Sequence, residues 1–361
     1  MNIIEINNYR DFLSLEEKWN QVLSKCNHTV FSTWEWLSIC WKHSGTNKRL
    51  IVLLAKDNGE IIGIAPLMYT VRTMFGLKRA KIEFMDDGVS DYNDFILVEK
   101  EDECVNLFIK HLNRFPLHWD CVDLSDISEN SKALPQLNRI AKNVTPFHTC
   151  SYIQLPKTHT IFMDSLKRNQ RRDIRRNLRR LEDKYKVEFT QYSGELPLDE
   201  EMNSFFDLHQ KRWESKSLPG VFASQTIRNF HLEIAKKFFE KGWLGLFQLK
   251  VSGTPAAALY GFKYQSKYYD YLTGFDPKFF PYNVGNLLRS HTIGECIKEG
   301  FAEFDFLRGA EEYKNRWNTQ IRFTKKVTLN RQGSFADIEN WLYSKYWDQG
   351  KRIKCVLKIN R

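Results

Sequence analysis

The densest group of side chains able to bind or catalyse lies in residues 304–317, with the sequence FDFLRGAEEYKNRW. Two phenylalanines share one face of a predicted strand, and Asp305 takes the other face. A turn at Arg308 leads into a predicted short helix that carries Tyr313, Lys314 and Trp317. Charged and aromatic groups at the end of a strand are typical of a functional site. The alternative is a structural ion pair, such as Asp305 with Arg308.

A second candidate precedes the predicted helix 287–299, where small or amide side chains occupy Asn283, Gly285 and Asn286. The free N–H groups at the start of a helix, together with the helix dipole, favour an anion. This pattern suits a pyrophosphate, although many α/β proteins contain such a turn as a plain loop.

A third candidate is the predicted helix 205–214, in which His209 and Trp213 are i, i+4 neighbours and Arg212 lies between them. A histidine beside arginine and tryptophan can line a polar pocket and act as a base. The alternative is a histidine on the helix surface with the tryptophan in the core.

The segment 167–180 holds eight basic residues and one acid, so it supplies +7 of the formal net charge of +10. Its arginines follow helical spacing, and Ile174 and Leu178 fall on the opposite face, which predicts that this segment is the amphipathic part, basic outside, of a long helix over residues 163–185. Arginine binds phosphate and carboxylate with two hydrogen bonds. The face can therefore capture cofactor phosphates, for which Arg172 and Arg176 are candidates, or an acidic glycan, anionic lipid or RNA. The alternative is a solvated face paired with acids.

The predicted elements that position these groups repeat along the chain. Both LIVLLAKDNGEIIGIAPLMY and WLGLFQLKVSGTPAAALYGF read as a strand, a short glycine turn and a second strand. Each half reads helix, helix, antiparallel strands, helix, strand, which predicts an α/β (α+β) fold of two tandem lobes with mixed, largely antiparallel sheets. The expected lobes are 1–155 and 156–361. No dinucleotide-binding or P-loop motif is present.

The N-terminal residues lack the basic and apolar regions of a signal peptide, and the longest apolar-rich stretch, 61–69, is too short for a membrane span. Seven scattered cysteines without a CxxC pair are typical of reduced thiols. We therefore expect a cytoplasmic protein without a transmembrane segment.

With these motifs in place, the chain resembles the CelD-like acetyltransferases, a GNAT-related group named for cellulose and exopolysaccharide biosynthesis. The resemblance rests mainly on DFLRG…E-YK-RW at 305–317, preceded by Tyr282, Gly285, Leu287 and Leu288. Weaker matches are FSTWEWL at 31–37, DYND at 91–94, the arginine-rich helix, and His209 with Arg212 and Trp213. The resemblance implies two GNAT-like lobes, with the catalytic elements in the second.

The resemblance also implies an acyl-CoA donor, a sugar or cell-envelope precursor as acceptor, and no metal. In the scheme we expect, Asp305 or, second, His209 acts as the base, and Tyr313 or Tyr271 protonates the leaving thiolate. Backbone N–H groups of strand 244–250 would stabilise the oxyanion. An acceptor, possibly anionic, would be bound by five residues: Arg308, Lys314, Arg212, Trp213 and Trp317.

Two alternatives remain at this point. The first is an aminoacyl-tRNA-dependent peptidyltransferase of the Fem type, which shares the two-lobed architecture. The absence of an obvious long helical hairpin in the second lobe makes it less favoured, so nucleic acid is an unlikely partner outside this alternative. The second is a non-catalytic protein that binds RNA or another anion through the arginines alone.

Overall fold

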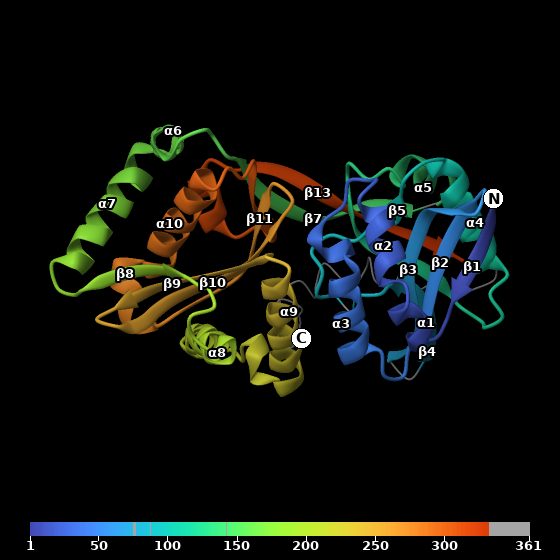
Figure 1. Ribbon diagram of the computed structural model, residues 1–361, viewed down its shortest axis with the longest axis horizontal. Helices are drawn as coiled ribbons and strands as arrows, with labels where there is room; N and C mark the ends of the chain where they lie inside the picture. Colours follow the sequence, from blue (N-terminus) through green and yellow to red (C-terminus); the bar gives the residue numbers. More distant parts are fainter. Residues whose placement is uncertain (75–76, 87, 142, 332–361) are drawn as a thin grey trace. The chain divides into compact units, whose positions relative to one another are not determined.

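The computed structural model describes residues 1–361 except 75–76, 87, 142 and 332–361. The chain forms two compact units (Figure 1). Among the described residues, unit 1 comprises Met1–Thr149 together with residues 322–331, and unit 2 comprises Cys150–Ile321. No helix among the described residues is both long and apolar enough to cross a bilayer.

Unit 1 has a mixed sheet in the order β1-β2-β3-β4-β6-β13, and the short β5 pairs with β3. Its core lies between this sheet and α4 and α5, around Phe108, Leu112 and Leu124. The elements of unit 1 are β1 (Asn2–Ile6), α1 (Tyr9–Leu13), α2 (Glu16–Leu23), η1 (Val30–Ser32), α3 (Trp34–Ser44), β2 (Arg49–Asp57), β3 (Glu60–Met74), β4 (Leu77–Phe84), β5 (Ile96–Leu97), α4 (Glu101–Asn113), β6 (Cys121–Ser128), α5 (Leu134–Ile140) and most of β13 (Gln320–Asn330).

Unit 2 has a sheet in the order β12-β11-β10-β9-β8, and β12 also pairs with the last residues of β7 (Asn143–Gln154), a strand that begins in unit 1. The other elements of unit 2 are α6 (His159–Ser165), α7 (Arg168–Glu182), β8 (Val187–Gln191), α8 (Leu198–Glu214), η2 (Val221–Ala223), α9 (Gln225–Glu240), β9 (Leu244–Val251), β10 (Thr254–Tyr264), β11 (Lys267–Phe275), η3 (Pro277–Tyr282), α10 (Val284–Lys298), β12 (Glu303–Arg308) and η4 (Glu312–Trp317).

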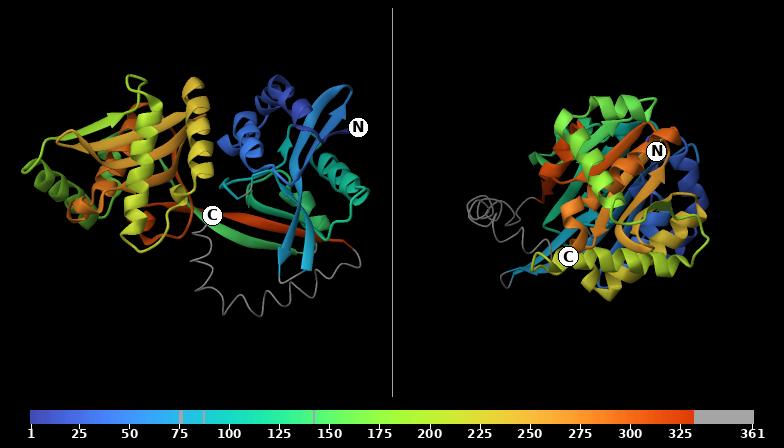
Figure 2. Two further views of the ribbon diagram at one scale, coloured as in Figure 1. Left: turned by 90° about the horizontal axis from the view of Figure 1, so that it is seen from below. Right: turned by 90° about the vertical axis from the view of Figure 1, so that its left-hand side faces the viewer.

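Helices cover both faces of the sheet in unit 2. Figures 1 and 2 show α7 and α10 on one face and α8 and α9 on the other. The α10 face holds the main core of the unit, with Leu288, Phe304 and Trp317 fully or almost fully buried. The α9 face is aromatic: Phe238 of α9 contacts Phe262 of β10, with ring centroids 5.0 Å apart. Every face of this sheet is therefore covered by a packed layer, as expected for a mixed α/β fold.

Both predicted hairpins form, and their turns explain why. Asn58 and Gly59 have φ values of 48° and 88°, and Ser252 and Gly253 have values of 50° and 82°. Two consecutive residues with positive φ give the type I′ turn, whose twist matches that of the flanking strands.

Two features differ from the sequence-based expectation. The predicted long helix 163–185 is interrupted, because Leu166 and Lys167 are extended between α6 and α7. The expected second lobe began at residue 156 and ran to the C-terminus, whereas β13 pairs with β6 of unit 1 from Thr324 to Asn330. The chain therefore returns to its first unit, where β13 lies between β6 and β7 in the strand order.

Candidate active site

The centre of unit 2 is the point where two parallel strands stop pairing. β11 and β12 pair only through Lys267–Tyr269 and Glu303–Asp305. Beyond these residues β11 and β12 continue without pairing with each other. We call this region the fork; it consists of Asp270–Phe275 and Phe306–Arg308. Unpaired backbone groups and side chains from both faces of the sheet can meet in such a region.

A bulge in β11 sets the side chains of the fork. The register with β10 shifts between Tyr260 and Phe262, so that Asp270 and Tyr271 together lie opposite Gly261. In a regular strand, residues three positions apart point to opposite faces. The extra residue brings Asp270 and Thr273 to the same face, because a bulge reverses the alternation.

Arg289 of α10 contacts both of these side chains. Its Nε donates to Asp270 Oδ2 at 2.6 Å, and a terminal nitrogen donates to Thr273 Oγ1 at 2.8 Å. All three residues are at least 93% buried. Burial alone would lower the pKa of Arg289, but the Asp270 carboxylate outweighs this effect and raises it. The guanidinium also lies 4.7 Å from the centre of the Tyr313 ring. Sequence reasoning missed this network; its one signal is an arginine within the apolar stretch LLRSHTI of the helix.

Arg212 reaches the same strand from α8, on the other face of the sheet. Its Nη1 donates to the carbonyl of Thr273 at 2.7 Å, and its guanidinium lies 5.3 Å from the centre of the Phe275 ring. Its Nε is buried without a hydrogen-bond partner, and no described carboxylate forms an ion pair with it. Burial lowers the pKa of Arg212. A buried cation without a counter-ion is costly, so this residue is suited to an anionic ligand.

His209 lies one helical turn before Trp213 and is 98% buried. Its Nε2 accepts a hydrogen bond from the Trp213 indole at 3.0 Å. The neutral ring must then carry its proton on Nδ1, which is buried without a partner. Burial, followed by the charge of Arg212, lowers the pKa of His209 to about 3. Because its only lone pair is occupied, His209 is poorly suited to the role of a base that we considered for it.

Asp305 occupies the base of the fork and is 99% buried. Its Oδ1 accepts a hydrogen bond from the backbone N–H of Leu307 at 2.8 Å. Leu307 has a φ of 59°, an unfavourable value for a branched side chain. The carboxylate therefore stabilises the irregular end of β12, in addition to any role in chemistry. Its side chain lies on the face opposite Phe304 and Phe306, as predicted.

Lys314 is not placed to bind a substrate. Its Nζ donates to the carbonyls of Leu307, Arg308 and Gly309 at 2.9–3.2 Å and forms an ion pair with Glu311 at 2.9 Å. An ammonium group has three donors, so these partners saturate it. Lys314 closes the end of β12, and of the three basic residues expected to bind the acceptor, Arg212 and Arg308 remain half-buried.

The aromatic residues predicted for the site separate into different environments. Trp317 is fully buried and stacks on Phe162, with ring centroids 6.4 Å apart, so it belongs to the core. Tyr271 contacts His231 and Phe262 on the α9 face. Tyr313 lies on the α10 face beside Arg289, and burial raises its pKa, an effect that Arg289 partly offsets. Tyr313 is thus a protonated phenol beside the fork. Trp213 is half-buried.

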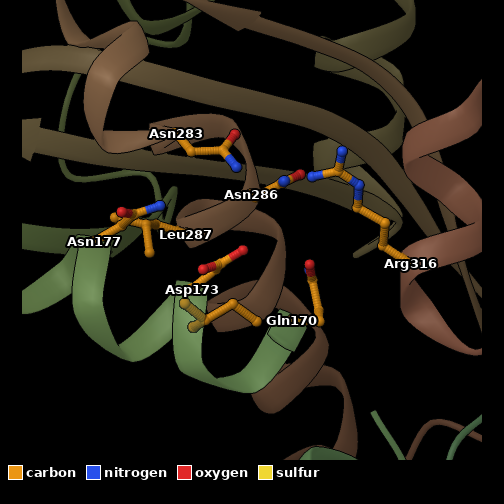
Figure 3. Close-up of a pocket in the computed structure, with 8 residues that line it drawn as sticks. Gln170, Asp173, Asn177, Asn283, Asn286, Leu287 and Arg316 are labelled. Atoms are coloured by element: carbon orange, nitrogen blue, oxygen red, sulfur yellow. The ribbon is translucent and has the colours of Figure 1, made fainter. Parts of the chain in front are cut away.

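A small pocket lies at the start of α10 (Figure 3). The N–H groups of Asn286 and Leu287 bond back to the Asn283 carbonyl, which leaves those of Val284 and Gly285 at the open end of the helix. Asn283, with a φ of 53°, makes the turn into the helix. The lining side chains are polar except for two: Gln170, Asp173, Ile174, Asn177, Asn283, Asn286, Leu287 and Arg316.

The pocket has unmet hydrogen-bonding capacity. The amide nitrogen of Gln170, a residue 93% buried, has no partner, and Arg316 forms no ion pair with a described residue. Figure 3 shows Arg316 extending toward Asn286, while Gln170 and Asp173 rise from α7. A Cβ at Gly285 would meet only the Phe275 ring, at 3.6 Å. The protein itself therefore does not require glycine there, but a phosphate approaching the helix start would.

The arginines expected at this pocket point elsewhere. α7 turns Gln170, Ile174 and Asn177 toward α10, whereas Arg172 and Arg176 are exposed. Arg176 pairs with Asp173 at 2.9 Å. Arg316 and Gln170 supply the polar groups in their place, and sequence spacing did not identify either residue.

The backbone N–H groups expected to stabilise the oxyanion are better placed on β11 than on β9, the predicted strand 244–250. Strand β9 pairs with β10 over its whole length and with β8 from Phe247 to Val251, so both of its edges are occupied over Phe247–Val251. The Thr273 carbonyl, by contrast, faces away from β10 and meets Arg212. In a strand, the N–H and C=O of one residue point to the same side. The N–H of Thr273 therefore lies on the same edge of β11 as its carbonyl, and this fork edge is where free N–H groups are expected.

Among the described residues, no group of three or more His, Cys, Asp or Glu side chains is arranged to hold a metal. The fork offers charge and hydrogen-bond donors on both faces of one strand end, and a small, mostly polar pocket lies at the start of the helix that follows β11. Such an arrangement can orient two reactants and stabilise negative charge.

Comparison with known families defines the class of this protein. Residues 168–315 match the family model described as an acetyltransferase (GNAT) domain. This range contains α7 to β12 and ends within η4, so it includes the fork and the α10 pocket. Most of unit 2 is therefore similar to a GNAT acetyltransferase domain, which indicates that the protein is an acyltransferase.

Similar solved structures cover nearly the whole chain. A crystal structure of FemX matches 91% of this chain and 97% of its own, with a TM-score of 0.63 and 12% identity. A conserved protein of unknown function from Bacteroides thetaiotaomicron matches 91% and 100%, with a TM-score of 0.56 and 11% identity. L-PGS from Bacillus licheniformis matches 88% and 92%, with a TM-score of 0.54 and 12% identity. At these identities the likeness shows a common fold. No curated protein sequence matches the chain.

Proposed function

We propose that unit 2 transfers an acyl group from acyl-CoA to an amine or hydroxyl of an anionic acceptor, such as a sugar unit of a cell-envelope or exopolysaccharide precursor. The observation that carries the proposal is Arg212: a cation at the fork with a buried, unpartnered Nε and no ion pair with a described residue. The sugar itself is supported by the resemblance to CelD-like acetyltransferases.

In this proposal the two faces of the sheet serve different reactants. The phosphates of the donor bind at the α10 pocket, where the helix N-terminus, Arg316 and the Gln170 amide offer donors. The thioester then extends along the fork. The acceptor binds from the α8 face, where Arg212 holds its anionic group. The strand end between them fixes the two reacting atoms, which is the main contribution to rate.

The proposed proton transfers use two residues beside the fork. Asp305 on the α8 face removes a proton from the attacking amine or hydroxyl. Tyr313, on the α10 face and protonated because burial raises its pKa, donates a proton to the departing thiolate sulfur. The N–H groups on the fork edge of β11 stabilise the negative charge that develops on the carbonyl oxygen. No covalent enzyme intermediate is involved, so the buried cysteines have no role.

Two measurements test this function. Thermal shift with acetyl-CoA and longer acyl-CoAs should show stabilisation, and a thiol-release assay with anionic sugar acceptors should show turnover. Absence of stabilisation by any acyl-CoA would overturn the assignment of the donor. Tyr313→Phe should lower kcat by about 10–100-fold without changing the affinity for acyl-CoA.

The role of Asp305 is tested by a matched pair of variants. Asn can still accept the hydrogen bond from the Leu307 N–H, so Asp305→Asn should keep the fold and lose activity about 100-fold or more. Asp305→Ala should lose both activity and stability. If Asp305→Asn turned over normally, the residue would be a purely structural support of β12.

Aminoacyl-tRNA as the donor is a second candidate, supported by the likeness to FemX over 91% of the chain. Under that alternative, turnover would stop on RNase treatment, and acyl-CoA would give no thermal stabilisation. Under the proposed function, RNase has no effect.

A further inference from the structure

The outer face of α7 carries a straight row of arginines. Arg168, Arg172, Arg175 and Arg179 are all exposed, and none forms an ion pair with a described residue. Their spacing of four, three and four residues keeps them on one face over about 16 Å of helix. We call these four residues the arginine row. Two acids near the row pair with other arginines, Asp164 with Arg171 and Asp173 with Arg176.

The packing of the helix holds this row on its exposed side. Ile174 and Leu181 are at least 91% buried, and Gln170 and Asn177 line the pocket toward α10. Figure 1 shows α7 along the outer edge of its unit, beside α10. The apolar side of α7 is therefore not available for insertion into a partner, and the row acts as a rigid basic ridge.

An exposed nonpolar side chain lies beside each end of the ridge. Ile161, on α6 immediately before α7, is 55% exposed. Phe280, on η3, is 73% exposed. η3 flanks the C-terminal end of α7, where the Arg180 guanidinium lies 5.6 Å from the Tyr282 ring and Tyr185 contacts Phe279. Basic residues flanked by exposed apolar residues are typical of surfaces that bind the headgroup region of a membrane.

We propose that the arginine row docks unit 2 on an anionic lipid surface, with Phe280 and Ile161 as shallow apolar contacts. A flat anionic surface suits a convex ridge, and arginine binds lipid phosphates with two hydrogen bonds. Proteins that bind single-stranded nucleic acid combine a basic groove with stacked aromatics, whereas this row is convex and holds no aromatic residue. Docking of this kind would bring the fork to acceptors carried on lipids.

The test compares two variants that remove the same charge from the purified full-length chain. One carries Arg172→Gln, Arg175→Gln and Arg179→Gln. The control carries Lys211→Gln, Lys236→Gln and Lys298→Gln, which removes three cations of unit 2 that already have carboxylate partners. Binding is measured by sedimentation with phosphatidylcholine vesicles containing 0 or about 30% phosphatidylglycerol, at low and high salt.

The wild type and the control should bind the anionic vesicles, and the arginine variant should bind at least tenfold more weakly. Phe280→Ser should weaken binding several-fold and leave the salt dependence unchanged. Turnover of soluble acceptor should be the same in all variants, so failure of docking is distinguishable from failure of the proposed activity. The proposal is overturned if the wild type does not bind anionic vesicles, or if the arginine variant binds them as well as the wild type does. It is also overturned if the arginine row is needed for binding tRNA and not for binding vesicles.

Discussion

The two units repeat one plan with different results. In unit 1, β4 and β6 pair in parallel through Lys81–Glu83 and Cys121–Asp123. In unit 2, β11 and β12 pair in parallel over the same length. A single long helix follows the first strand of each pair, α4 in one unit and α10 in the other. Each of these helices begins after a residue in the left-handed conformation, Lys100 with φ 50° and Asn283 with φ 53°.

The first turns of the two helices differ in charge. α4 begins with Glu101, Asp102 and Glu103, whereas the first turn of α10 has no acid. Acids satisfy a helix N-terminus and repel a phosphate from it. The strands also differ: β3 and β4 keep an unbroken register from Leu67–Phe84 to Met74–Leu77, whereas β11 carries a bulge. We propose that the same scaffold becomes a site when the first turn of the helix carries no acid and the strand is distorted by a bulge.

The largest expected effect is on stability, and it comes from the hydrogen bonds of Arg289 with Asp270 and Thr273, which the bulge in β11 makes possible. Arg289→Met leaves Asp270 buried without its partner, and we expect a loss of about 3–5 kcal/mol in the free energy of unfolding, measured by urea denaturation. The matched change in unit 1 is Lys81→Met. Asp123 keeps its second partner Lys326 at 2.9 Å, so the loss there should be about 1 kcal/mol.

A double variant separates the buried charge from the packing. Asp270→Asn with Arg289→Met removes both charges, and should recover a large part of the stability lost by Arg289→Met alone. Equal stabilities of the single and double variants would mean that lost packing around Arg289, and not the stranded carboxylate, causes the effect.

The next largest expected effect is on activity, when acids like those in the first turn of α4 are introduced into the first turn of α10. Gly285→Glu with Asn286→Asp should lower kcat/KM for acyl-CoA by about 100-fold or more, because two carboxylates would face the donor phosphates. The melting temperature should not fall, since acids are favourable in the first turn of a helix. The converse control, Glu101→Gln with Asp102→Asn, should leave activity unchanged. An active grafted enzyme would remove the α10 pocket from the donor site.

A smaller change at the same position is steric. Gly285→Ala adds a Cβ that the protein accommodates, at 3.6 Å from the Phe275 ring. Alanine also favours a helix, so the stability should stay equal or rise by up to about 1 kcal/mol. The KM for acyl-CoA should rise by about tenfold while kcat changes little, because the methyl group lies where the phosphate approaches. Unchanged steady-state kinetics would show that this glycine is not at the donor site.

The smallest effect is a pH dependence in unit 1. Burial raises the pKa of Asp94 to about 7, although Ser131 and the Phe95 N–H donate hydrogen bonds to it. The folded state therefore holds a proton that the unfolded state releases near pH 4, so this group makes stability decline as the pH rises from about 4 to 7. Asp94→Asn should be more stable than the wild type by about 1 kcal/mol at pH 8, since the side chain keeps some solvent contact.

Thermal unfolding of both proteins from pH 4 to 8 measures this difference. The advantage of the Asn variant should become small toward pH 4, where Asp94 is protonated in the folded state and roughly half protonated in the unfolded state. A difference that is constant with pH would assign the effect to packing. No matching pH dependence should arise from His209, which stays neutral over this range because burial lowers its pKa to about 3.

The sequence by itself determined the plan of the molecule, because the signals for that plan are local. Alternating apolar residues around Asn58-Gly59 and Ser252-Gly253 specify the hairpins. Asn283 before a glycine and a helical pattern specifies the turn into α10. The arginines of α7 and its apolar stripe fix which face is exposed. The run 305–317 indicated an acyltransferase and the region of its site.

Only the tertiary structure decided which polar side chains are free to act, because that depends on register and on partners distant in sequence. Lys314 looks available in the sequence, yet three carbonyls and Glu311 occupy it. Asp270 and Thr273 look like residues on opposite faces, yet a bulge opposite Gly261 brings both to Arg289. A shift of one residue in strand pairing leaves no mark in composition or spacing, but it reverses the faces of the strand and thereby creates the fork.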